Sequence, residues 1–84
     1  MMKLVWVTGA EVYSEYTLLV TFNDGSRKFF DCRMLLDSGN ALYEPLQDMK
    51  IFKGIALDGW TVTWKDGMID VAPEFLYDKG IPVK

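Results

Sequence analysis

The clearest pattern in the sequence is an alternation of larger and smaller or more polar side chains between positions 16 and 23. Residues two apart lie on the same side of an extended chain, so one face of a strand would carry a set of large side chains. That set is Tyr16, Leu18, Val20 and Phe22. The alternation therefore predicts a strand that buries this face.

A hairpin turn is predicted directly after this strand, at Asp24-Gly25. Glycine accepts a positive φ angle, and aspartate tolerates one better than most residues. If the loop contains only these two residues, Val20 lies opposite Phe29 and Leu19 lies opposite Phe30. A loop of three residues would shift that register.

The chain before the hairpin begins with an apolar run from Leu4 to Val7. Such a run predicts a strand with little exposed face. Gly9-Ala10 indicates a bend or bulge, after which the strand resumes from Glu11 to Tyr13. As an edge strand, the run from Leu4 to Val7 could pair with another chain, including a second copy of this one.

Short helical segments are predicted in the middle of the chain. Asp31 is a candidate N-cap for a helix over residues 32–37, and the Ser-Gly-Asn sequence at 38–40 ends it. Asp48 is a candidate cap for a single turn at Met49–Phe52.

The last third of the chain predicts short strands separated by Asp-Gly turns, over residues 55–57, 60–64 and 69–71. Trp60, Val62 and Trp64 would share one face of the middle strand. Pro73 fits the first turn of a helix, where a missing N–H group costs nothing, and Glu74 suits the positive end of that helix. The predicted fold class is α+β: a mainly antiparallel β-meander sheet of five or six short strands with two or three short helices, in a single domain over residues 1–84.

Four segments of the chain are similar to those of a known family. They are Leu-Leu-Val-Thr-Phe-Asn-Asp-Gly at 18–25, the Asp-led Leu-Leu helix at 31–36, Tyr-Glu-Pro-Leu-Gln-Asp at 43–48, and the stretch from Trp64 to Tyr77. The chain thereby resembles the domain of unknown function 2442 family of small bacterial proteins. The resemblance implies a small α+β meander with no established activity, substrate or cofactor. Some members resemble partners in two-gene toxin–antitoxin-like pairs, and others carry an added helix-turn-helix domain for which we expect no room in this chain.

Charge and cysteine content narrow the functional classes. The 84 residues include nine basic and twelve acidic side chains, for a net charge of −3, and the densest basic stretch is only Arg27-Lys28. Nucleic-acid binding normally requires a basic stripe, so neither nucleic acid nor an anionic membrane is an expected partner. Cys32 is the one cysteine, which rules out an internal disulfide. We expect no signal peptide at Met1-Met2-Lys3, no membrane span and a cytoplasmic location.

Most catalytic arrangements are excluded because the chain has no histidine. Cys32 could act as a nucleophile only if the start of the helix depressed its pKa, and we interpret it as a partly buried helix residue. We expect no catalytic residue, metal site or cofactor. A third possibility, binding of single-stranded nucleic acid through aromatic residues, lacks a basic groove.

The remaining candidates are carboxylates and aromatic rings. Asp58, Asp66 and Asp70 could form a site, but Asp58 and Asp66 precede glycines in turns, and Asp70 could bond N–H groups at the next helix start. Aromatic side chains could line a partner groove, although core packing is their simpler role. The candidate binding residues are Trp60, Trp64, Asp70 and Tyr77, and Trp6 is a further aromatic residue that could join them.

We therefore expect a non-enzymatic protein-interaction module, the accessory or antitoxin-like member of a two-gene pair. Its expected partner is another protein, and the adjacent genes are the candidates to encode it. The alternative is a small-ligand-binding or enzymatic domain that uses the carboxylates near Asp58, Asp66 and Asp70.

Overall fold

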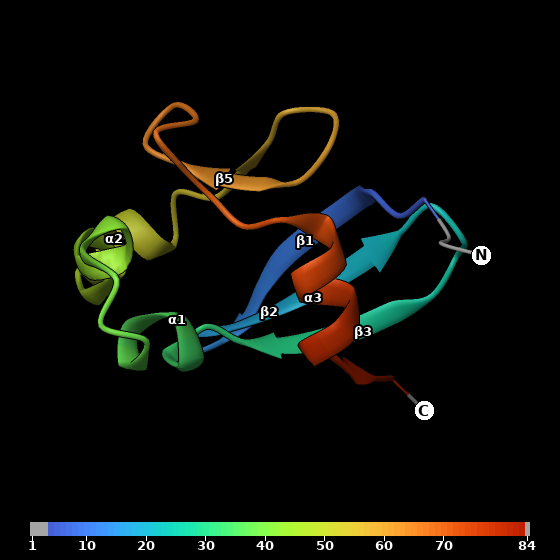
Figure 1. Ribbon diagram of the computed structural model, residues 1–84, viewed down its shortest axis with the longest axis horizontal. Coiled ribbons are helices and arrows are strands. Elements are labelled where there is room, and N and C mark those ends of the chain that lie inside the picture. Colours follow the sequence, from blue (N-terminus) through green and yellow to red (C-terminus); the bar gives the residue numbers. More distant parts are fainter. Residues whose placement is uncertain (1–3, 84) are drawn as a thin grey trace.

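The structure, a computed structural model, describes residues 4–83, so Met1 to Lys3 and Lys84 lie outside the described residues. Within that range it contains two antiparallel sheets and several short helices (Figure 1). The first sheet has the order β1-β2-β3-β7, with bounds Val7–Ser14, Thr17–Phe22, Arg27–Asp31 and Ile81–Pro82. The second has the order β4-β5-β6, with bounds Ala56–Leu57, Val62–Trp64 and Ile69–Asp70. The α+β class is confirmed, with the strands divided between two sheets instead of forming one.

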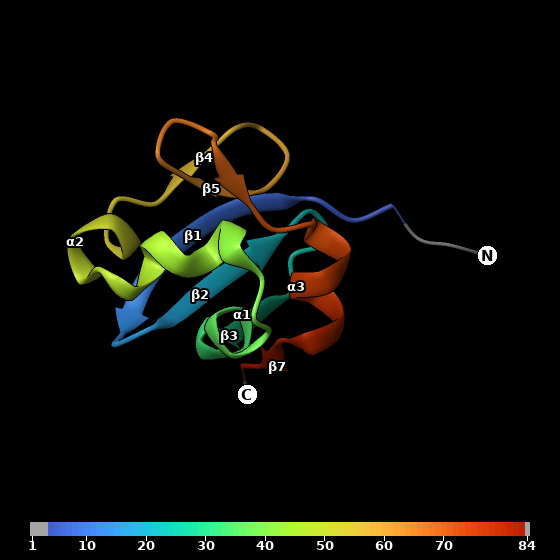
Figure 2. The ribbon, with the colours of Figure 1, turned by 60° about the vertical axis from the view of Figure 1, so that its left-hand side comes forward.

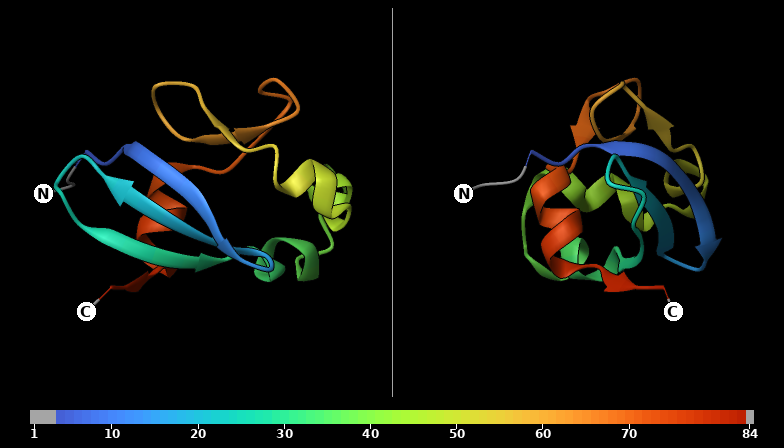
Figure 3. Two further views of the ribbon diagram at one scale, coloured as in Figure 1. Left: turned by 180° about the vertical axis from the view of Figure 1, so that it is seen from behind. Right: turned by 90° about the vertical axis from the view of Figure 1, so that its right-hand side faces the viewer.

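The helices connect and cover the sheets. They are α1 (Arg33–Asp37), the 3-10 helix η1 (Ala41–Gln47), α2 (Met49–Phe52) and α3 (Pro73–Lys79). In Figure 2, α1, η1 and α3 lie over one face of the larger sheet, with the smaller sheet along its top edge. The left view of Figure 3 shows the opposite face, over which no described element lies. The larger sheet therefore has a covered face and an open face.

One hydrophobic core joins these layers. Leu18, Val20 and Phe22 of β2 point into it, which confirms the face predicted from the alternation. The smaller sheet and α3 enter the same core cluster, through Val62, Trp64, Ile69 and Leu76. Burial of these side chains is the main favourable contribution to folding.

The β2–β3 hairpin differs from its predicted register by one residue. Leu19 lies opposite Phe29, and Leu18 lies opposite Phe30. The loop contains three residues, because the N–H of Phe22 donates to the carbonyl of Ser26 at 2.9 Å and Gly25 adopts a φ of 85°. As a result Phe30 faces the core and Phe29 faces the open side.

Asn23 explains both the longer loop and an incorrect prediction at the N-terminal end. Its side-chain oxygen accepts from the N–H of Trp6 at 2.9 Å, and its own N–H donates to the carbonyl of Trp6 at 3.0 Å. At this position the side chain of Asn23 takes the place of a backbone acceptor, and regular strand pairing ends, so the predicted strand from Leu4 to Val7 is wrong. The strand begins at Val7, and Leu4 is 63% exposed. The predicted irregularity is present as a register shift between Val7 and Gly9.

The turn between β1 and β2 contains Tyr16, which adopts a φ of 58°. Its hydroxyl donates to the carbonyl of Gln47 at 2.7 Å, and its ring lies 5.2 Å from that of Phe52. Its carbonyl accepts from the N–H of Cys32 at 2.7 Å. A left-handed conformation is uncommon for an aromatic residue, and these distant contacts are what hold it.

One of the two predicted helix caps is confirmed. Asp31 is not the N-cap of α1, because the helix begins at Arg33 and its N-cap is Cys32; the carboxylate of Asp31, one residue earlier, accepts from the N–H of Arg33 at 2.9 Å. Asp48 accepts from the N–H of Lys50 at 2.9 Å at the start of α2. Such caps satisfy N–H groups that the helix itself leaves without partners.

The C-terminal part begins as predicted and ends in a strand that the sequence did not indicate. Pro73 is at the first turn of α3, and the helix ends at Gly80. The chain then pairs with β3, placing Ile81 opposite Phe29 and Pro82 opposite Lys28. Proline is tolerated there because β7 is an edge strand.

Candidate functional site

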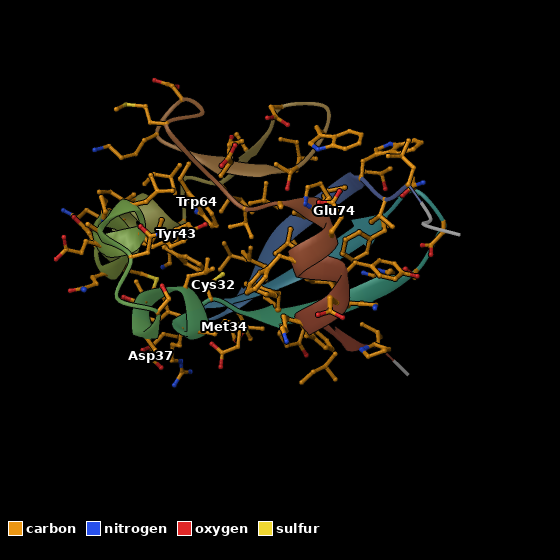
Figure 4. The ribbon with its side chains drawn as sticks, viewed as in Figure 1. Cys32, Met34, Asp37, Tyr43, Trp64 and Glu74 are labelled. Carbon is orange, nitrogen blue, oxygen red and sulfur yellow. The ribbon has the colours of Figure 1, made fainter. Side chains whose placement is uncertain are left out.

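A concave surface with a mostly apolar lining lies on the covered side of the molecule, between α1 and the start of α3. We call it the α1–α3 groove. Its volume is about 450 Å³, and its lining residues are Met34, Leu35, Ser38, Asn40, Tyr43, Val71, Ala72 and Phe75. Figure 4 shows Met34 on α1, Tyr43 on the neighbouring 3-10 helix and Glu74 at the first turn of α3.

The turn between α1 and η1 shapes one end of the groove. Gly39 adopts a φ of 78°, which reverses the chain after α1. The hydroxyl of Ser38 donates to the carbonyl of Leu35 at 2.6 Å, and the side-chain oxygen of Asn40 accepts from the N–H of Leu42 at 2.9 Å. The polar side chains at this end thus hold the backbone of the turn, and the rest of the lining is mostly apolar.

The walls of the groove carry large side chains that the core does not cover. Met34 is 37% exposed and Phe75 is 38% exposed. The ring of Phe75 packs edge-on against Phe30, with centroids 5.9 Å apart, so one side of it is fixed and the other faces the groove. Exposed apolar side chains that line a hollow are a typical feature of binding sites.

Tyr43 connects the groove to the smaller sheet. Its hydroxyl donates to the backbone carbonyl of Asp70 at 3.2 Å. Partial burial raises the pKa of Tyr43, and the charge of Asp70 adds to this effect. The hydroxyl is therefore neutral at physiological pH and acts as a hydrogen-bonding group.

Most of the charged residues that are adjacent in the sequence to lining residues are acidic, and we call this set the rim of the groove. Five exposed charged residues are next to lining residues in the sequence: Arg33, Asp37, Glu44, Asp70 and Glu74. Four of these carry a carboxylate and one carries a guanidinium, which lies 3.6 Å from the carboxylate of Asp31. Figure 4 shows Asp37 and Glu74 on the two helices that form the walls.

The two candidate tryptophans have different environments. Trp64 has no exposed surface, its Nε1 donates to the carbonyl of Phe52 at 2.9 Å, and its ring lies 6.2 Å from that of Phe52. Its ring therefore offers no surface to a ligand. Trp60 is 41% exposed and stacks on Trp6 at 6.1 Å. It precedes β5 instead of lying within it, so the predicted strand start is wrong.

Tyr77 is part of a separate set of contacts near the hairpin loop. Its hydroxyl donates to Asp24 at 2.7 Å, and Nζ of Lys28 lies 3.8 Å from the ring centroid. The ring also packs edge-on against Phe22, at 5.0 Å. Tyr77 and Trp60 are not in the lining of the α1–α3 groove. Asp70 contacts a lining residue through its backbone carbonyl, which accepts from the hydroxyl of Tyr43.

The carboxylates singled out in the sequence act locally. Asp58 accepts from the N–H groups of Thr61 at 2.8 Å and Trp60 at 2.9 Å, and these bonds lower the pKa of Asp58. Asp66 adopts a φ of 56° in the next turn. Within residues 4–83, no group of three or more His, Cys, Asp or Glu side chains could hold a metal ion.

Asp70 was expected to accept hydrogen bonds from N–H groups at the start of α3, and this prediction is wrong. In the described part of the chain, its carboxylate makes no hydrogen bond to α3. The residue before this helix is Ala72, whose carbonyl accepts from the N–H of Phe75 at 3.0 Å.

Cys32 is a core residue. Its side chain is fully buried, and burial raises the pKa of the thiol to about 12, with a further contribution from the charge of Asp31. Only the thiolate is a strong nucleophile, so this position is chemically inert at neutral pH. Figure 4 shows Cys32 near the middle of the molecule, above α1 in this view.

The sequence did not single out Met34, Tyr43 or Phe75. A signal was present at two of these positions, since Met34 and Phe75 each precede a leucine on a short helix. Neighbouring positions on a helix point about 100° apart, so when the leucine of such a pair faces the sheet directly, the residue before it lies toward the edge of the buried face.

The chain shows similarity to one family. A family model described as protein of unknown function (DUF2442) matches residues 7–82. No curated protein and no solved structure matches the chain. Among the described helices, none has the length and apolar character needed to cross a membrane.

Proposed function

Because this chain belongs to the DUF2442 family of proteins of unknown function, we propose a function for it from the surface of the molecule: a non-enzymatic protein-interaction module. We further propose that it is the accessory or antitoxin-like member of a two-gene pair, that it acts in the cytoplasm, and that its partner is encoded by an adjacent gene.

The observation that carries this proposal is the amount of large apolar side chain at the surface of so small a domain. At least a third of the side chain is exposed at Leu4, Tyr13, Met34, Leu42, Leu57, Trp60, Met68, Phe75, Ile81 and Val83. Single exposed apolar residues are normal, but clustered ones are typical of interaction sites.

Residues 4–83 contain two such clusters. One is the α1–α3 groove, with Met34 and Phe75. The other is the open face of the larger sheet, where Phe29 lies opposite Ile81 and the ring of Tyr13 lies 4.6 Å from that of Phe29. Exposed apolar side chains gathered in this way support binding of another protein.

The test is co-expression of the tagged protein with the product of each adjacent gene. We expect one of these products to copurify as a stoichiometric complex, with a Kd of about 1 μM or lower by calorimetry. Failure of every adjacent product to bind would contradict the proposal. Light scattering of the protein alone distinguishes this result from self-association, in which the mass would double without any partner.

A further inference from the structure

We infer that the α1–α3 groove binds an amphipathic helix of the partner, whose apolar side chains enter the groove and whose flanking side chains are lysine and arginine. This inference rests on the proposed function and specifies its site and the chemistry of the partner.

The shape of the groove supports an apolar anchor. A volume of about 450 Å³ is within the range of roughly 300–1,000 Å³ that is typical of ligand clefts. Met34, Val71, Ala72 and Phe75 supply apolar surface along its length. No charged residue is among the lining residues, so an apolar side chain that enters would displace no ion pair.

The walls of the groove favour a helical partner over an extended one. They come from α1, α3 and the start of η1, together with the turn at 38–40 and the two residues before α3. An extended peptide gains affinity by adding a strand to a sheet edge, and no strand of either sheet is in the lining. A helix forms its backbone hydrogen bonds internally, so it needs only apolar side chains at i, i+3 and i+4 to fill a groove.

The charge of the rim specifies the polar side of the partner. Of the charged residues that adjoin the lining in the sequence, four are acidic (Asp37, Glu44, Asp70 and Glu74) and one is basic, Arg33, which already has Asp31 nearby. Lysine or arginine beside the apolar anchors would complement this rim and raise the rate of association. An acidic partner would be repelled.

The open face of the larger sheet is the weaker candidate for this docking. Tyr13 packs on Phe29 there and covers part of the apolar surface, and Leu19 is buried. Glu11 lies opposite Leu19, and Arg27 lies on β3, so the charges of this face have both signs. Such a face does not select a basic partner.

The first experiment uses two synthetic probes. One is a peptide of about 15 residues with leucine at the i, i+3, i+4 and i+7 positions and lysine elsewhere, and the other has glutamate in place of every lysine. We expect the lysine peptide alone to bind the isotope-labelled protein saturably and to shift the amide signals of Met34, Ala72 and Phe75. Equal binding of both peptides, no saturable binding up to about 1 mM, or shifts confined to β1 and β3 would overturn the inference.

Substitutions then test the site without removing buried atoms. Ala72→Trp fills the groove from an exposed position and should weaken lysine-peptide binding at least about tenfold. The double variant Asp37→Asn/Glu74→Gln should weaken lysine-peptide binding about fivefold. This loss should be smaller at high salt, where the charges are screened. Ile81→Ser on the open face is the matched control and should change binding less than about twofold. An effect of Ile81→Ser alone would contradict the inference.

The same variants separate this inference from the proposed function. If the adjacent gene product binds the Ala72→Trp protein as well as the unaltered one, the groove is the wrong site and the interaction function stands. If no adjacent product binds the unaltered protein, the proposed function fails, whatever the peptides do.

Discussion

At the residue scale, two tryptophans four positions apart have opposite roles. Trp64 is enclosed in the core and its indole N–H satisfies the carbonyl of Phe52, whereas Trp60 stacks on Trp6 at the surface. Their sequence context did not separate them, because both were expected on one face of the same strand. The difference arises because the strand begins only at Val62.

This difference predicts unequal effects of the same substitution. Trp64→Phe removes the partner of a buried carbonyl and leaves a cavity, so the free energy of unfolding should fall by about 2–3 kcal/mol. Trp60→Phe should lower it by less than about 1 kcal/mol. Urea titrations followed by circular dichroism measure both, and equal losses would show that Trp64 is not the buried member of the pair.

Cys32 predicts a pH dependence of stability. The pKa of its thiol rises from an ordinary 9.0 to about 12 in the folded protein. Between these values the unfolded chain binds fewer protons, so this contribution to stability is complete below pH 9 and is lost as the pH rises toward 12. The free energy of unfolding should fall by up to about 1.4 kcal/mol per pH unit in that range. Cys32→Ala should show a shallower decline, and identical slopes for the two proteins would contradict the assignment.

At the element scale, the sequence predicted several elements well and one register incorrectly. The cap at Asp48 was predictable because it depends on a neighbour two residues away. The hairpin register was not readable, because the extra loop residue, Asn23, bonds a segment 17 positions distant. Strand β7 was missed for a related reason, since two residues form a strand only when β3 offers an edge.

Gly80 joins α3 to that last strand and predicts a steric effect. A Cβ atom there would lie 2.7 Å from the carbonyl oxygen of Leu76 and 2.9 Å from Cβ of Lys28. Gly80→Ala should lower the free energy of unfolding by about 1–3 kcal/mol. It should also speed hydrogen exchange at the N–H of Val83, which bonds Arg27. Gly25→Ala is the control: it strains a positive φ in open space and should leave Val83 unaffected.

At the scale of the whole molecule, the groove shows the limit of local patterns. Its lining comes from residues 34–43 and 71–75, which only the completed fold brings together. The sequence correctly identified Asp58 and Asp66 as turn residues, but it gave no indication that Met34, Tyr43 and Phe75 would meet. Exposed side chains on the short helices indicated a binding surface only once the fold showed which of them lie next to one another.

The shared core predicts that the two sheets unfold together. Trp64 and Val62 of the smaller sheet and Leu18 and Val20 of the larger one belong to the same cluster. Protected amides of β2 and β5 should therefore exchange with opening free energies that agree within about 1 kcal/mol in native-state hydrogen exchange. A much lower value for β5 would show that the smaller sheet opens as a separate unit.

The turn at Tyr16 has a consequence for anyone who wishes to re-engineer this chain. Backbone statistics would recommend glycine or asparagine at its φ of 58°. Such a replacement relaxes one residue and releases the side-chain attachments to Gln47 and Phe52. A short turn between two strands is a natural choice for an inserted tag or a permuted terminus. This turn, however, connects the β1–β2 hairpin to the helical layer, so an inserted sequence belongs in another loop.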